Sequence, residues 1–441
     1  MIDAVVYGAA QLVVGPSHGD RNTEESIHGR AAPATGGKPP ADPAEVLEIH
    51  ENAAIAIEDG TVAAVGATGD IVREYPPENA ATAIDASGRA VLPGFVDSHT
   101  HAIFAGDRSD EFAAKLRGKR YQEILAEGGG ILRTVRATRE ASDEELLDRL
   151  LEHLDVMLEH GSTTAEVKSG YGLDTRTERR LLRLIDRADD RHPVRVVPTF
   201  MGAHAVPDGV DADEYASEVV DEQLPAIAEQ GIAAFCDVFC EEGVFSVEQS
   251  RTILSAGLEY DMPAKIHAEE FVRLGGAQLA AELGAVSADH LLHASTADVR
   301  ALRSAGVVPV LLPGTAFALG TDYADARAFR DAGVEIAIAT DFNPNCHAPG
   351  MDFATTLACV GMGLSPAEAI RAGTHGGALA LGSADPSIDA VTAGTGTLQP
   401  GAPGDLLVLD APSYEHVPYR FGQNAIDAVL VGGEREGGGD R

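Results

Sequence analysis

Short apolar segments recur in the first ninety residues, and turn residues such as Glu58-Asp59-Gly60 separate them. They occupy residues 4–14, 53–57, 61–65 and 81–85. Apolar runs of this length between turn residues are typical of β-strands. We therefore predict a small β module at this end of the chain, interrupted by a long Gly- and Pro-rich loop over residues 15–43.

From residue 91 onward, apolar segments alternate with amphipathic helices. Ser142 and Glu145 form a capping-box pair, and the leucines after them, at helical spacing, make one apolar face. Counting from the segment before His99, we predict eight strands, each followed by a helix. The later seven cover residues 163–167, 194–200, 233–239, 263–266, 286–289, 307–312 and 335–339. This alternation predicts an α/β fold, a TIM-like (β/α)₈ barrel.

β character returns near the end of the chain, at residues 405–409. We expect these residues to join the first strands in one composite β-sandwich domain. The predicted organisation is residues 1–90 and 385–441 as the two parts of that domain, and residues 91–384 as the barrel. Because of its glycine run, the tail from Glu434 onward is expected to be frayed.

Charge narrows the set of partners. The 441 residues carry 33 Lys+Arg against 69 Asp+Glu, a formal net charge of −36. Such a charge argues against nucleic acid or an anionic membrane surface as a partner, while 44% hydrophobic residues argue against disorder. We predict a folded protein with an acidic, hydrated surface suited to a salt-rich, halophilic cytosol, where screening weakens self-repulsion.

Cysteine content and the first residues indicate the compartment. Four cysteines are too few for a disulfide framework, so a reducing compartment fits best. The segment Met1–Val6 has an early acid and no basic region, unlike a signal peptide. No apolar run approaches the roughly 20 residues of a spanning helix. We expect a cytoplasmic protein with no membrane partner.

Candidate chemistry begins at His99 and His101, just after the apolar run that ends in Phe95-Val96. Residues i and i+2 of a strand face the same side, so we predict two imidazoles side by side, half of a metal site. Such a pair alone is equally consistent with core histidines. Further candidates at predicted strand ends are His204, His267, His290 and Asp341. Imidazoles with one carboxylate suit a catalytic zinc or iron.

These residues resemble the amidohydrolase superfamily and, within it, the imidazolonepropionases of histidine degradation. The segment Leu92–His101 is similar to that of any superfamily member. Motifs in family order carry the narrower resemblance: Ala105–Arg108, Gly128–Ile131, Lys168–Leu173, Thr199–Pro207, Lys265–Glu270, Ser287–His290 and Thr340–Pro344.

The resemblance implies a function and a set of site residues. The implied reaction is hydrolysis of 4-imidazolone-5-propanoate to N-formimidoyl-L-glutamate, in which one Zn²⁺ or Fe³⁺ per chain activates water to open a cyclic amide. The implied metal ligands are His99, His101, His267 and Asp341. The implied substrate contacts are Arg108, Tyr121, Tyr171, His204, Glu270, Asn343, Asn345 and Cys346, and the implied catalytic residues are Glu270, His290 and Asp341. A small-molecule substrate and a homodimer are expected.

One departure from the family is visible at Asn345-Cys346, where the family usually has a glycine followed by a small hydroxyl residue. Single residues also have other interpretations. Arg108 could form a surface ion pair with Asp107 or Asp110, and Lys168 could be a charge on the barrel floor.

Three other interpretations of the whole site stay open at this point. Another mononuclear amidohydrolase, such as a nucleobase deaminase, would share the metal ligands but has no use for a carboxylate-binding Arg108. A dinuclear dihydroorotase-type site requires a carbamylated lysine after the fourth strand, and residues 235–243 contain no lysine. A metal-free scaffold of the same fold would not need to retain every type of ligand.

Overall fold

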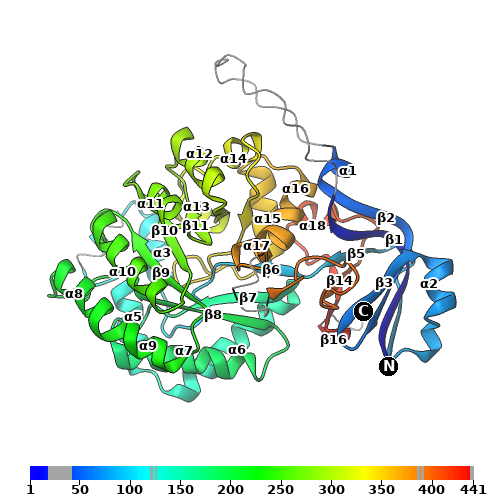
Figure 1. The fold of residues 1–441 in the computed structure, drawn as a ribbon, viewed down its shortest axis with the longest axis horizontal. Helices are drawn as coiled ribbons and strands as arrows, with labels where there is room; N and C mark the ends of the chain where they lie inside the picture. The colour runs from blue at the N-terminus through cyan, green and yellow to red at the C-terminus, as the bar shows by residue number, and fades with distance from the viewer. Residues whose placement is uncertain (18–41, 120–122, 125–126, 385–387, 389–391, 438–441) are drawn as a thin grey trace, which may run out of the picture.

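The computed structural model describes residues 1–17, 42–119, 123–124, 127–384, 388 and 392–437. Most of the predicted loop over residues 15–43 lies outside the described residues, and so does Tyr121. The described chain forms two sheets. One is a barrel surrounded by helices, and the other stands beside it and contains both ends of the chain (Figure 1).

The barrel has eight parallel strands, hydrogen-bonded to one another in chain order. They are β6 (Phe95–Asp97), β7 (Ser162–Lys168), β8 (Arg195–Ala203), β9 (Phe235–Cys240), β10 (Ala264–Ala268), β11 (Ser287–His290), β12 (Val308–Leu311) and β13 (Ala337–Ile338). Parallel neighbours require a crossover between successive strands, which the helices provide. The predicted (β/α)₈ barrel is confirmed, and its carboxyl-end face is where sites are built in this fold.

The barrel closes through the segments that follow its first and last strands. Thr100 pairs with Phe342, the His101 N–H donates to the Phe342 carbonyl at 2.9 Å, and the Asp341 N–H donates to the His99 carbonyl at 3.0 Å. Strand β6 ends at Asp97, so His99 and His101 lie just beyond the predicted strand end, and the alternation of a strand does not by itself orient them. Pairing with the segment after β13 holds them instead.

Helices surround the barrel. They are α3 (Ser109–Leu116), α5 (Ile131–Glu140), α6 (Asp143–Glu159), α7 (Thr175–Asp189), α8 (Ala212–Glu218), α9 (Leu224–Gln230), α10 (Val247–Glu259), α11 (Gly276–Leu283), α12 (Thr296–Ala305), α13 (Pro313–Leu319), α14 (Ala326–Asp331), α15 (Met351–Val360), α16 (Pro366–Arg371) and α17 (Gly377–Ala380), with π-helical turns η2 (Val219–Gln223) and η3 (Ala372–Gly376). Ser142 caps α6 by accepting from the Glu145 N–H at 3.1 Å, and leucines of α6 are buried as predicted. Among the described helices, none is long and apolar enough to cross a membrane.

The second sheet combines strands from both chain ends, in the order β16-β15-β14-β5-β1-β2-β3 with β4 beside β1. Its strands are β1 (Ile2–Pro16), β2 (Leu47–Glu58), β3 (Thr61–Ala67), β4 (Thr82–Asp85), β5 (Ala90–Pro93), β14 (Leu406–Leu409), β15 (Ile426–Val431) and β16 (Glu434–Gly437). Short helices α1 (Pro43–Val46), α2 (Thr68–Glu74) and α18 (His416–Tyr419), with the 3₁₀ turn η1 (Pro77–Asn79), accompany it. The predicted composite β domain is confirmed. The expectation that the tail frays from Glu434 was wrong for residues 434–437, which form a strand, and residues 438–441 lie outside the described residues.

Gly94 separates the two sheets. The apolar run around it continues as β5 in the composite sheet before this residue and as β6 in the barrel after it. A Cβ atom at Gly94 would lie 2.1 Å from Oγ1 of Thr163, so no larger residue fits without a shift of the chain. The domain boundaries at residues 90 and 384 stay predictions.

Candidate active site

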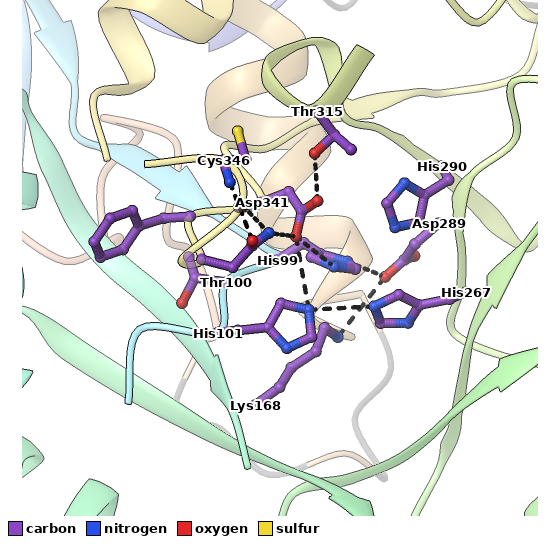
Figure 2. Close-up of polar contacts among 12 residues, drawn as sticks. His99, Thr100, His101, Lys168, His267, Asp289, His290, Thr315, Asp341 and Cys346 are labelled. Atoms are coloured by element: carbon purple, nitrogen blue, oxygen red, sulfur yellow. Dashed lines mark hydrogen bonds and ion pairs between the residues drawn. The ribbon is translucent and has the colours of Figure 1, made fainter. Parts of the chain in front are cut away.

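The four predicted metal ligands converge at the carboxyl-end face of the barrel (Figure 2). Nε2 of His99 lies 3.5 Å and Nε2 of His101 lies 3.6 Å from Oδ1 of Asp341. Nε2 of His267 lies 3.3 Å from Nε2 of His101. All four side chains are buried. Residues separated by up to 242 positions in the sequence (99 to 341) therefore contribute to one centre.

The donor atoms fit a metal ion. Nε2 of His99 is buried and has no hydrogen-bond partner, and the facing nitrogens of His101 and His267 call for a shared cation or proton. Burial lowers the pKa values of His99 and His101 well below the ordinary histidine value, so both rings are neutral, as metal binding requires. Three imidazoles and one carboxylate are a donor set for zinc or iron.

Two carboxylates behind the histidines orient their rings. Nδ1 of His99 donates to Oδ2 of Asp289 at 2.6 Å, and Nδ1 of His267 donates to Oδ1 of Asp237 at 3.0 Å. These contacts fix the tautomers that direct Nε2 toward the centre. Nζ of Lys168 lies 2.7 Å from Oδ2 of Asp237 and 3.8 Å from Oδ2 of Asp289. Lys168 is fully buried, which agrees with the interpretation of a charge on the barrel floor.

Asp237 and Asp289 were not among the site residues expected from the sequence. A signal was present for Asp237, because it is an aspartate inside the otherwise apolar strand β9. A carboxylate rarely occupies such a position unless it is paired.

Asp341 is held by its neighbours in an uncommon backbone conformation, with φ of 50°. The Thr315 hydroxyl donates to Oδ2 of Asp341, and Nδ2 of Asn343 donates to Oδ1 at 3.0 Å. Oδ1 of Asn343 accepts from the backbone N–H of Asn345 at 2.7 Å. The Asn343 amide thus shapes the loop around the carboxylate ligand.

A pocket opens in front of this centre. Its lining includes most of the predicted site residues: His101, Arg108, Tyr171, His204, His267, Glu270, His290, Asp341, Asn343 and Asn345, with Ile131, Phe239, Phe271, Thr315 and Leu319. The apolar members and Thr315 were not foreseen. Tyr121 lies outside the described residues.

Arg108 is a buried cation in this pocket. Its Nε donates to Oε2 of Glu111 at 2.8 Å, while Nη2 is buried and has no hydrogen-bond partner. Oε1 of Glu111 accepts from the Gly130 N–H at 3.0 Å, which anchors the carboxylate. The alternative of a surface ion pair with Asp107 or Asp110 is wrong, because Arg108 is only 5% exposed and pairs with Glu111.

His204 and Tyr171 form one wall of the pocket. The His204 ring stacks on that of His101, with centroids 4.7 Å apart, and its Nδ1 donates to the Gly170 carbonyl at 3.0 Å. Burial lowers the pKa of His204 to about 3, so the ring is neutral. Glu178 accepts from the backbone N–H of Gly170 at 2.9 Å and so fixes the loop that carries Tyr171.

Glu270 and His290 face each other beside the metal ligands, with Oε2 and Nε2 3.6 Å apart. Burial, then the charges of Asp341 and Glu241, raise the pKa of Glu270 well above its ordinary value. Burial lowers the pKa of His290. These shifts favour the protonated carboxyl group of Glu270 and the neutral imidazole of His290, one able to donate a proton and the other able to accept one.

The comparison with known proteins agrees with this site. Residues 90–435 match the model of the amidohydrolase family. The chain is 62% identical to the imidazolonepropionase of Haloarcula marismortui, over 98% of this chain and 95% of that protein. It is 57% identical to the imidazolonepropionase of Halobacterium salinarum, over 99% of both. The chain belongs to the amidohydrolase family, among the imidazolonepropionases.

The same fold occurs among solved structures. The crystal structure of an adenosine deaminase from Xanthomonas campestris with bound zinc matches this fold with a TM-score of 0.69. That match has 18% sequence identity and covers 98% of this chain and 92% of the other. At this identity the likeness shows the shared fold.

Asn345 and Cys346, which depart from the imidazolonepropionase pattern, lie differently with respect to the pocket. Asn345 lines the pocket. Cys346 does not, because its thiol lies 3.7 Å from the Thr340 carbonyl and points away from the histidines (Figure 2). The predicted substrate contact of Cys346 therefore gains no support from its orientation.

Proposed function

We propose that the chain hydrolyses 4-imidazolone-5-propanoate to N-formimidoyl-L-glutamate in histidine degradation. The observation that carries the proposal is that a metal-binding donor set and a buried arginine line one pocket. Hydrolysis of a cyclic amide that carries a carboxylate needs both groups. The water is activated by the metal, and the carboxylate is held by the arginine. The two relatives at 62% and 57% identity bear the name of this activity.

We infer one Zn²⁺ or Fe³⁺ per chain, held by His99, His101, His267 and Asp341. When bound, such an ion lowers the pKa of a coordinated water from 15.7 to about 7 and polarises a carbonyl group. The zinc in the adenosine deaminase of similar fold supports a metal of this class.

Arg108 is the proposed partner of the propionate group. Glu111 accepts from Nε, and the buried Nη2, which has no hydrogen-bond partner, is left for the ligand. A guanidinium can hold a carboxylate through two parallel hydrogen bonds. On a protein of net charge −36, an anionic substrate needs such a local cation.

The proton transfers of the hydrolysis are assigned to Asp341, His290 and Glu270. Water adds to the ring carbonyl carbon, the bond from that carbon to the ring nitrogen breaks, and the nitrogen receives a proton. We assign acceptance of the proton from the attacking water to Asp341 and His290. We assign its delivery to the leaving nitrogen to Glu270, whose raised pKa supports a protonated carboxyl group.

We also propose a cytoplasmic homodimer. The free thiols of Cys236, Cys240, Cys346 and Cys359 support a reducing compartment. Exposed apolar side chains on and near the neighbouring helices α13, α15 and α18, such as Phe317, Val360 and Tyr419, support self-association. Light scattering should give about twice the chain mass of 45.9 kDa.

The experiment is an absorbance assay of imidazolonepropanoate with wild type and Arg108→Ala. Loss of the arginine should cost about 2–4 kcal/mol of binding to the carboxylate. That equals roughly 30- to 1000-fold in kcat/KM. An analogue without the carboxylate should lose much less, and Arg117→Ala, at an exposed arginine nearby, should change neither.

Two results would overturn the proposal. Wild-type protein that contains its metal and leaves imidazolonepropanoate unchanged would remove the assigned substrate. Deamination of a nucleobase by the same preparation would favour the other mononuclear amidohydrolase reaction.

A further inference from the structure

Lys115 joins the helix that follows Arg108 to the loop that carries Asp341. It lies in the last turn of α3, and its Nζ donates to Oδ1 of Asn345 at 2.9 Å, across 230 positions of the sequence. Burial, then the charge of Arg108, lower the pKa of Lys115. The lysine therefore lies half-buried within the electrostatic reach of the proposed carboxylate site.

This contact decides how the Asn345 amide is oriented. An ammonium group carries donors and no acceptor, so the amide atom that faces it must be the oxygen. The Nδ2 group of Asn345 is therefore turned away from Lys115. Because Asn345 lines the pocket, its two N–H donors remain for a ligand there.

Asn345 is fixed on its backbone side as well. Its N–H donates to Oδ1 of Asn343 at 2.7 Å, and Nδ2 of Asn343 donates to Oδ1 of Asp341 at 3.0 Å. A continuous chain of hydrogen bonds thus runs from Lys115 to the carboxylate ligand. These hydrogen bonds connect Asn345 to Asp341 on one side and to α3 on the other.

We propose that Lys115 is a positioning residue for substrate recognition, which orients Asn345 so that its amide N–H groups bind the anionic tail of the substrate beside Arg108. The inference rests on the proposed function. It assigns to Asn345 a side-chain donor that glycine at this position could not supply. A carboxylate has enough acceptor sites for the Arg108 fork and one amide together.

The test compares Lys115→Met with Arg117→Met in the holoenzyme. Both remove one cation from the same segment, but Arg117 is exposed and outside the pocket. Lys115→Met should raise KM for imidazolonepropanoate about tenfold, the loss typical of one hydrogen bond to a charged group, with kcat changed less than about twofold. Arg117→Met should leave both values unchanged.

Two further measurements distinguish orientation of the Asn345 amide by Lys115 from a direct effect of the Lys115 charge. In an Asn345→Gly background, Lys115→Met should add no further rise in KM, because it acts through the amide. With an analogue that lacks the carboxylate, Lys115→Met should have no effect. Equal losses on both substrates, fully additive effects in the double variant, or an unchanged KM would each overturn the inference.

Turnover by the wild type in the same assay distinguishes failure of the proposed function from failure of the inference about Lys115. If the wild type does not act on imidazolonepropanoate, the proposed function fails and this inference fails with it. If the wild type is active and Lys115→Met matches it, only the inference is overturned.

Discussion

Lys168 acts on two of the proposed metal ligands, His99 and His267, without touching either. Its ammonium pairs with Asp237 and Glu166 and lies near Asp289, all fully buried. Burial alone would lower the pKa of Lys168, but these carboxylates together raise it above the ordinary lysine value, so the group stays charged. The cation thereby compensates the two carboxylates that orient His99 and His267.

Replacement of Lys168 by methionine should weaken metal binding. The variant leaves Asp237 and Asp289 buried without their cation, so the carboxylates shift or take up protons and release the imidazole rings. We expect a loss of about 10- to 100-fold in metal affinity, the range for partners behind metal ligands. Competition with a chelator measures it, and far-UV circular dichroism checks the fold.

A partly exposed lysine gives the control. Lys119→Met, which removes the ion pair with Glu127, should keep wild-type metal affinity. Equal affinity in Lys168→Met and wild type would contradict this role for the buried lysine.

At the scale of elements, the barrel and its site are built by the same contacts. The segments after β6 and β13 pair with each other, and they carry His99, His101 and Asp341. Closure of the barrel therefore brings the proposed ligands together. The uncommon positive φ of 50° at Asp341 lies in the segment after β13, and that of 74° at His290 lies at the end of β11.

A second contact between elements, from α6 to α15, is sensitive to pH. His160, at the end of α6, contacts Oδ1 of Asp352 in the first turn of α15 at 3.0 Å. The hydrogen bond from Asp352 raises the pKa of His160. A raised folded-state pKa stabilises the protein below the unfolded value near 6.5, and the contribution is lost as pH rises through the folded value.

His160→Gln should therefore destabilise the protein more at pH 6 than at pH 9. The pair is partly exposed, so we expect a difference of no more than about 1 kcal/mol in the free energy of unfolding. Urea titrations of wild type and variant at both pH values measure it. A destabilisation that grows with pH would show that the charged histidine is not the stabilising form.

The sequence predicted the elements better than their connections. Strand periodicity located the barrel, and the rule that parallel strands end on one face brought His267, His290 and Asp341 together. The pattern could not show that β6 stops at Asp97 or that Cys346 turns away from the pocket, because both depend on pairing with distant segments. The partnership of Lys115 with Asn345 likewise exists only after folding.

At the scale of the whole molecule, the net charge of −36 sets the response to salt. Repulsion among surface carboxylates opposes the compact state, and salt shortens its range from about 10 Å at 0.1 M to about 3 Å at 1 M. We expect Tm to rise by several degrees between these two concentrations of KCl, as measured by differential scanning calorimetry.

Sodium chloride at equal ionic strength should give a similar rise, because screening depends on ionic strength and not on the identity of the ion. A Tm that is equal at low and high salt would contradict the view of an acidic surface suited to a salt-rich cytosol.

Metal-dependent turnover tests the central claim most directly. Protein stripped of metal by a chelator should fail to convert 4-imidazolone-5-propanoate, and one equivalent of zinc or iron should restore formation of N-formimidoyl-L-glutamate. The same addition should not restore His101→Ala, which retains only three of the four ligands and should keep its fold. Full activity in a preparation verified to be free of metal would contradict the account.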